Sequence, residues 1–177
     1  ENGVAAYGVM MYVSMIFSSA FIGYSIGTAP VIGYHYGAQN YTELKGLLRK
    51  SLIMTGIFGI FMVVAAEVSA VPLAQIFGGY DLILIELTVS GVRIFALSFF
   101  FMGFAIFGSG FFTALNDGLT SALISFLRTL LFQVAAVLLL PMIWGINGVW
   151  ISIIVGECMG VILTVVFLFI KQKKYHY

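Results

Sequence analysis

Charged side chains are scarce in this sequence, at 8% of 177 residues. Globular proteins in water carry about 25% charged residues, so this chain has too few charges to cover a water-facing surface. Hydrophobic residues make up 62% of the chain instead. The composition therefore excludes a soluble domain and predicts a chain embedded in lipid.

Other absences narrow the class of protein further. The net charge is only +1, which provides no basic field for nucleic acid, so no nucleic-acid partner is expected. Cys158 is the single cysteine and has no partner for a disulfide within the chain. The two histidines, His35 and His176, are far apart in the sequence, so we expect no metal site and no cofactor. No glycine-rich loop ending in Lys-Ser or Lys-Thr indicates direct use of ATP.

What the sequence does contain is a series of apolar runs separated by polar turns. Each run supplies the ~20 residues that a helix needs to cross ~30 Å of hydrocarbon. The alternation of polar and apolar residues typical of membrane strands is absent. We therefore predict an all-α polytopic membrane helix bundle with about five transmembrane helices. The runs cover approximately residues 4–32, 51–73, 83–113, 119–144 and 149–170.

The basic residues predict the orientation of these helices, because short cytoplasmic loops are enriched in Lys and Arg. With the C-terminus in the cytoplasm, only Arg93 lies toward the opposite side. Arg128 is then interpreted as an anchor whose long side chain reaches the inner interface. This orientation places residue 1 outside and predicts at least one more helix before it. The basic residues assigned to the cytoplasmic side are Lys45, Arg49, Lys50, Arg128, Lys171, Lys173 and Lys174.

A distinctive motif, GTAPVIGYHYGAQN, closes the first run at residues 27–40. Proline removes a backbone donor and glycine accepts a left-handed conformation, so the motif predicts a helix end. A hinge for a cytoplasmic gate is an alternative that is compatible with this interpretation. The predicted helix-end signature consists of Pro30, Gly33, Tyr36, Gly37, Ala38 and Asn40.

This motif resembles the signature of the multidrug and toxic compound extrusion (MATE) transporters, where it closes the second helix of each six-helix lobe. His35 and Gln39 replace commoner residues of that signature. The resemblance implies that residues 1–177 form a partial C-terminal transmembrane lobe, from the eighth helix to the twelfth, without the first lobe and one helix. Later features that also resemble the second lobe are Phe77 with Asp81, Arg93, the stretch 125–128 and the turn GINGVW at 145–150.

The resemblance further implies a secondary active multidrug efflux antiporter rather than an enzyme. Such a protein exports cationic amphipathic organic compounds in exchange for protons or sodium. The stretch that corresponds to the tenth helix, residues 94–113, contains no acidic residue, which favours protons as the coupling ion. The implied partners are the lipid bilayer, small organic cations and the missing N-terminal lobe, in the bacterial inner membrane. The alternatives are a lipid-linked sugar flippase of the same superfamily and a non-transporting membrane scaffold.

Polar residues inside the apolar runs are the candidates for a substrate or ion pathway. Glu157 lies ten residues from Asn147, which places it ~15 Å into the bilayer. A carboxyl group at that depth faces a cavity or a partner. Glu157 is therefore predicted either to couple protons or contact substrate, or to pair with Arg93 at a comparable depth. Gln133 is predicted either to line the same cavity or to make an interhelical hydrogen bond. Close helix approach within the lobe is predicted at three glycine pairs: Gly23 and Gly27, Gly33 and Gly37, and Gly156 and Gly160.

Overall fold

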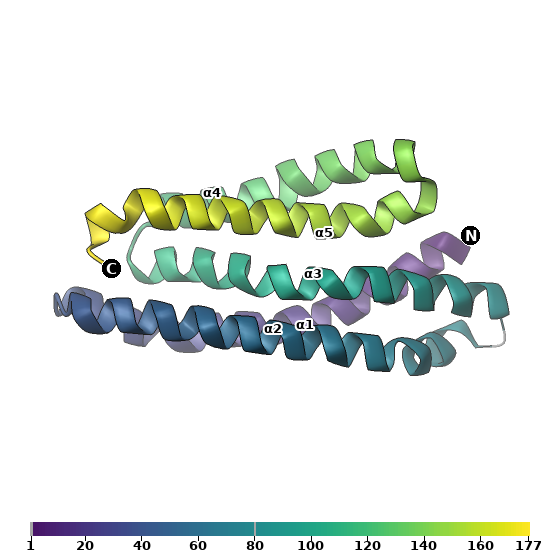
Figure 1. Cartoon of the computed structure of the whole chain (residues 1–177), viewed down its shortest axis with the longest axis horizontal. Coiled ribbons are helices and arrows are strands. Elements are labelled where there is room, and N and C mark those ends of the chain that lie inside the picture. The colour runs from purple at the N-terminus through teal and green to yellow at the C-terminus, as the bar shows by residue number, and fades with distance from the viewer. Residues whose placement is uncertain (1, 80) are drawn as a thin grey trace.

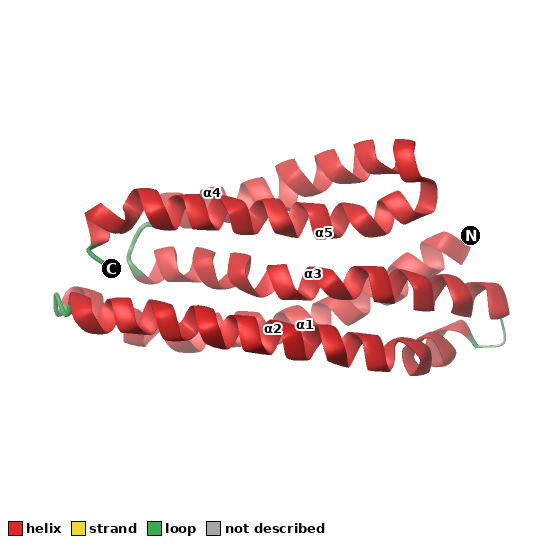
Figure 2. Cartoon of the chain, in the orientation of Figure 1, coloured by secondary structure: helices red, strands yellow, loops and turns green. Residues whose placement is uncertain are grey.

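The computed structural model describes residues 2–79 and 81–177, and every secondary-structure element within them is a helix. Figures 1 and 2 show long helices that run along one axis, with the connecting loops at the two ends of the bundle. The predicted all-α bundle is therefore confirmed. The elements are α1 (Asn2–Gly37), α2 (Tyr41–Gly78), α3 (Leu82–Ala114), α4 (Gly118–Phe126), the π-helix η1 (Leu127–Phe132) and α5 (Gln133–Tyr175).

The number of spanning segments differs from the prediction. Four continuous helical segments of the described chain are long and apolar enough to cross a membrane. The predicted count of five is slightly off because the fourth and fifth runs join without a loop, in one helical segment over 118–175. Inside this segment Gly145 has non-helical torsion angles, φ 56° and ψ −136°, which glycine adopts without steric cost. Figure 1 shows the ribbon of α5 turning back on itself, so residues 118–144 and 146–175 form the first and second arms of a helical hairpin.

The two arms approach closely because the second arm presents glycines to the first. A Cβ added to Gly156 would lie 2.5 Å from Oε1 of Gln133, and one added to Gly160 would lie 2.9 Å from Cγ of Arg128. The predicted close approach is therefore confirmed for this pair. At three other predicted positions a Cβ would meet no neighbouring atom within 4 Å, and the prediction is wrong for them within the described chain: Gly23, Gly27 and Gly37.

The end of α1 also differs in detail from the prediction. The helix continues through Pro30 and ends at Gly37, and neither Gly33 nor Gly37 has a positive φ. The left-handed residue is Gln39, with φ 54°. It directly precedes Asn40, whose side chain caps α2 by accepting a hydrogen bond from a first-turn backbone N–H at 3.3 Å. The motif thus forms a tight turn between two helices, and the left-handed position is not one of its glycines.

Helix α3 lies at the centre of the bundle, and α1, α2 and α5 all pack against it. Buried aromatic side chains such as Phe99, Phe111 and Trp150 fill the interior in two clusters. The outward faces carry large exposed apolar side chains instead of charges, for example Ile26, Val68, Met142 and Phe169. Such an apolar surface is compatible with the acyl tails of lipid. Because the tails are apolar themselves, exposure of these side chains to them has no hydrophobic cost.

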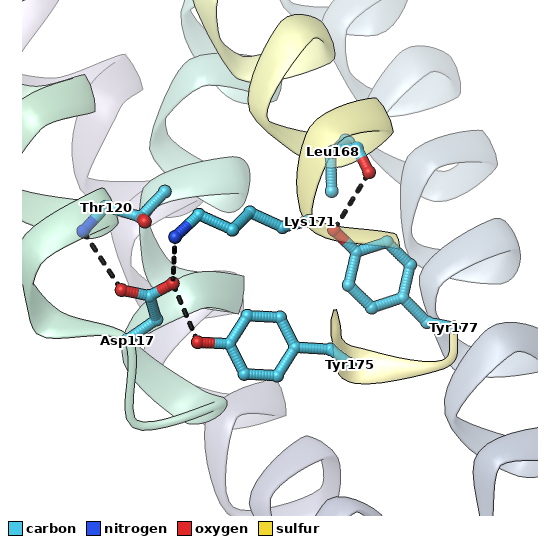
Figure 3. A network of polar contacts seen from close by, with 6 residues as sticks. All are labelled: Asp117, Thr120, Leu168, Lys171, Tyr175 and Tyr177. Atoms are coloured by element: carbon cyan, nitrogen blue, oxygen red, sulfur yellow. Dashed lines mark hydrogen bonds and ion pairs between the residues drawn. The ribbon is translucent and has the colours of Figure 1, made fainter. Parts of the chain in front are cut away.

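Asp117 connects the turn between α3 and α4 to the end of α5 through polar contacts at one end of the bundle (Figure 3). Its Oδ1 accepts a hydrogen bond from the Thr120 N–H at 3.2 Å and caps α4. Its Oδ2 accepts a hydrogen bond from the Tyr175 hydroxyl at 2.7 Å and lies 3.3 Å from Nζ of Lys171. Burial opposes ionisation of this carboxyl group, but the hydrogen bonds outweigh it and lower the pKa of Asp117 from 3.8 to about 2.

The stability that Asp117 contributes is expected to disappear in acid. Because folding lowers its pKa, the contribution is fully present above pH 3.8 and is lost as the pH falls through about 2. A shift of this size corresponds to about 2 kcal/mol at neutral pH. Asp117→Asn should therefore lower the unfolding temperature of the complete gene product in detergent at pH 7, and the difference from wild type should shrink toward pH 2. Lys173→Gln, at the same end of the bundle, is the control. Equal unfolding temperatures at pH 7 for wild type and Asp117→Asn would contradict this role.

Candidate functional site

A cavity of about 470 Å³ opens between α1, α3, η1 and α5. Its apolar wall includes Met11, Phe95 and Met102, and the flexible thioether side chains can adapt to ligands of different shape. Its polar wall, which we call the polar cavity wall, gathers hydroxyl, amide and charged groups from three elements. These groups belong to Ser14, Ser18, Arg128, Thr129, Gln133 and Glu157.

An ion pair lies at the centre of this wall. Nε of Arg128 is 2.9 Å from Oε2 of Glu157, and the two side chains are only 18% and 7% exposed. Within the described residues, the buried Oε2 of Glu157 accepts no hydrogen bond. Buried carboxylate oxygens in proteins normally accept at least one. The two atoms are close enough for a charge-assisted hydrogen bond but are not well aligned for one, and the carboxyl group of Glu157 retains acceptor capacity toward a proton or a ligand in the cavity.

The predicted pairing of Glu157 with Arg93 is wrong. Nε of Arg93 lies 3.7 Å from Oε2 of Glu67, and both side chains are about half exposed. The depth estimated for Arg93 gives no information about the helix face on which it lies. The α3 residues that line the cavity include Phe95, and positions two apart on a helix point in different directions. Arg93 therefore stands outside the polar cavity wall.

The prediction that Arg128 anchors at the membrane interface is also wrong. Its side chain is mostly buried and reaches Glu157 across the hairpin. The sequence contains a signal for this position, because Arg128 lies ten residues after Gly118. At ~1.5 Å per residue this count gives a depth of ~15 Å, equal to the depth of Glu157 counted from the opposite end. Two opposite charges at one depth on consecutive helices would have indicated the pair.

The π-helix η1 positions this part of the cavity. Its wide turn is closed by the Gln133 N–H, which donates to the carbonyl of Arg128 five residues earlier. π-Helical turns are rare and occur frequently at functional sites. Residues 127–132 read LRTLLF and contain neither proline nor glycine, so sequence reasoning had no signal for this segment.

Gln133 lines the cavity beside Glu157, as one of its two predicted roles requires. Its side chain packs against Gly156 on the opposite arm of the hairpin. No hydrogen bond joins the Gln133 side chain to another helix in the described chain. The amide therefore belongs to the cavity wall and is not an interhelical cross-link.

The contrast between two glycines predicts a difference in stability. Gly156→Ala is expected to lower the stability of the complete gene product by about 1–3 kcal/mol, because the new Cβ would overlap the Gln133 side chain. Gly37→Ala should leave stability unchanged or slightly raised, because its Cβ would meet no neighbour and alanine favours a helix. Thermal unfolding in detergent measures both variants. Equal destabilisation by the two substitutions would show that the close contact between the arms is absent.

The length and composition of the helices and the charged groups buried in their interior define a multi-pass membrane protein. The family model MatE matches residues 1–139. The chain belongs to this family. No curated protein matches the sequence.

Solved structures support the same fold. An outward-facing multidrug resistance MATE family transporter of the MOP superfamily is 22% identical, with a TM-score of 0.92 over 99% of this chain and 40% of that one. The Vibrio cholerae MATE transporter VcmN in its bent form is 22% identical, with a TM-score of 0.87 over 99% and 39%. The MATE multidrug transporter DinF-BH is 26% identical, with a TM-score of 0.85 over 97% and 38%. The chain thus spans about 40% of the length of these transporters.

Proposed function

We propose that this chain is a C-terminal transmembrane lobe of a secondary active multidrug antiporter that exports cationic amphipathic organic compounds. The observation that carries the proposal is the buried ion pair of Arg128 and Glu157 in the polar cavity wall. Membership of the MatE family supports it, as does the similarity of the fold to solved multidrug transporters. The missing N-terminal lobe would form the other half of the protein, and alternating access would come from movement of the two lobes around a central site.

The charge state of the ion pair explains how a proton and an organic cation could be exchanged at this site. With Glu157 ionised, Arg128 and Glu157 together carry no net charge, and the adaptable apolar wall can accept an organic cation. A proton on Glu157 leaves the positive charge of Arg128 uncompensated in a site of low dielectric, where it repels a cation strongly. Occupancy by a proton and by an organic cation then oppose each other. We take the proton and not sodium as the coupling ion, because residues 94–113 contain no acidic residue, and the exchange requires no enzyme chemistry.

We place the C-terminus in the cytoplasm, with the protein in the bacterial inner membrane. Support comes from the end of the bundle at which the α1–α2 turn and the C-terminus meet (Figure 1). Six of the eight basic residues belong to this end, and the positive-inside rule assigns such an end to the cytoplasm. Arg128 no longer counts toward the rule, because it is buried in the bundle. The six residues are Lys45, Arg49, Lys50, Lys171, Lys173 and Lys174.

Efflux of ethidium by the complete gene product tests this function. In proteoliposomes, an inward proton gradient should drive ethidium export, a protonophore should abolish it, and replacement of sodium by choline should leave it unchanged. Export that depends on sodium would contradict proton coupling. Absence of gradient-dependent flux would contradict the antiporter, and altered envelope synthesis on gene deletion would then favour the sugar flippase. Absence of both effects would favour a scaffold.

A further inference from the structure

A second groove lies on the outside of the bundle, between α2 and α5. Both helices pack on α3, with little direct contact between them in the described chain. Two cavities of about 470 Å³ and 330 Å³ occupy the space that they leave. Leu52, Val165 and Leu168 line both cavities, so the two form one continuous groove, which we call the α2–α5 groove.

The chemistry of the α2–α5 groove changes along its length. At the end of the bundle that holds the α1–α2 turn and the C-terminus, the groove is lined by Lys45 and Arg49 together with Gln172. Toward the middle of the bundle it is lined by aromatic and aliphatic side chains, among them Phe100 and Phe104. No acidic residue lines either cavity. Lys45 and Arg49 are exposed, and neither forms an ion pair within the described residues. The groove therefore offers two uncompensated positive charges above an apolar channel.

The length of the groove fits one leaflet of a bilayer. Gln172 at the charged end and Val161 at the apolar end, which both line the groove, lie eleven positions apart along α5. At ~1.5 Å per residue this distance is ~16 Å, about half of the ~30 Å hydrocarbon thickness. The charged end thus lies at the depth of lipid headgroups, and the apolar end lies near the bilayer midplane.

We propose that the α2–α5 groove is a binding site for an anionic glycerophospholipid. The headgroup phosphate lies against Lys45 and Arg49, and one acyl chain follows the apolar channel past Leu52 and Val165. Basic pockets between membrane helices bind anionic headgroups by this charge complementarity, and each nearby Lys or Arg adds to the attraction. Two adjacent cations oppose entry of a cationic drug, so this site is separate from the polar cavity wall. The proposal does not depend on transport activity.

Lipid titration of the complete gene product tests the site. Native mass spectrometry would compare phosphatidylglycerol with phosphatidylcholine of the same acyl chains, both added to protein in detergent. We expect wild type to prefer phosphatidylglycerol, and the double variant Lys45→Gln/Arg49→Gln to bind it about tenfold or more weakly. The matched control Lys173→Gln/Lys174→Gln removes the same charge from the same end of the bundle, outside the groove, and should bind within about twofold of wild type.

A second variant tests the apolar channel separately from the charges. Val165→Trp fills the groove at a partly exposed position and should weaken phosphatidylglycerol binding without lowering the unfolding temperature. Equal binding of the two lipids by wild type would overturn the proposal. An equal loss in the Lys173→Gln/Lys174→Gln control would show attraction to general surface charge only, and would overturn it as well. A cysteine in the groove, Ile53→Cys, tests whether another protein segment covers it. If its thiol is protected from maleimide in lipid-free protein, such a segment occupies the groove and the lipid-site proposal is overturned.

Discussion

Arg128→Met should destabilise the complete gene product by about 3–5 kcal/mol, because it leaves Glu157 as an unpaired carboxylate in a buried site. The double variant Arg128→Met/Glu157→Met should recover most of this loss. Replacement of a buried ion pair by apolar side chains of similar volume is often neutral or stabilising, since both desolvation costs disappear. Equilibrium unfolding in mixed detergent micelles, read by tryptophan fluorescence, gives the free energy of unfolding for each variant.

The exposed pair of Arg93 and Glu67 is the matched control for this experiment. Its side chains are 56% and 44% exposed, and the atoms are 3.7 Å apart. Arg93→Met should therefore cost at most about 1 kcal/mol, because an exposed ion pair contributes little. If Arg128→Met costs no more than Arg93→Met, the buried pair does not exist in the folded protein. If the double variant loses as much as the single one, the effect comes from packing and not from an unpaired charge.

Depth along a helix could be predicted from this sequence, but direction around the helix axis could not. Counting residues from a turn places Glu157 near the bilayer midplane and identifies it as the residue that requires a partner. The same count places Arg93 at a similar depth, although its face of α3 points elsewhere. Direction depends on how α1, α3 and the hairpin arms pack together, and this packing is a property of the whole bundle. Depth alone leaves both Arg93 and Arg128 as candidate partners of Glu157, and the structure shows that Arg128 is the partner.

Local backbone geometry could be predicted only in part, because some of it depends on the packing of the whole bundle and not on the local sequence. Apolar length alone identifies the helices, because backbone groups in lipid must be satisfied internally. The reversal at Gly145 coincides with a predicted turn, and the two arms meet there at a sharp kink with no intervening loop. The π-helical turn at 127–132 has no sequence signature. At this turn Arg128 and Gln133 contact residues of the second arm that lie far away in the sequence.

A further prediction concerns Glu157 and rests on the proposed antiport. Glu157→Gln keeps the shape of the side chain but removes its negative charge, so Arg128 stays uncompensated at every pH. The cavity then resembles its protonated state permanently. Ethidium should bind about tenfold or more weakly to the purified complete gene product, because a like charge in a site of low dielectric repels it. Any dependence of ethidium affinity on pH that arises from protonation of Glu157 should also disappear. Fluorescence titration measures both quantities.

The neutral double variant Arg128→Gln/Glu157→Gln separates a coupling role from a structural one. It has neither the carboxyl group nor the uncompensated charge, so ethidium affinity should return toward the wild-type value while pH dependence stays absent. A purely structural cross-link predicts another pattern, in which both variants lose folded protein and the remaining folded fraction binds ethidium with normal pH dependence. Glu157→Asp retains the charge on a shorter side chain and should keep part of the pH dependence. If affinity falls equally in the single and double variants, repulsion by Arg128 is not the cause, and the proposed rule for exchange between protons and cations fails.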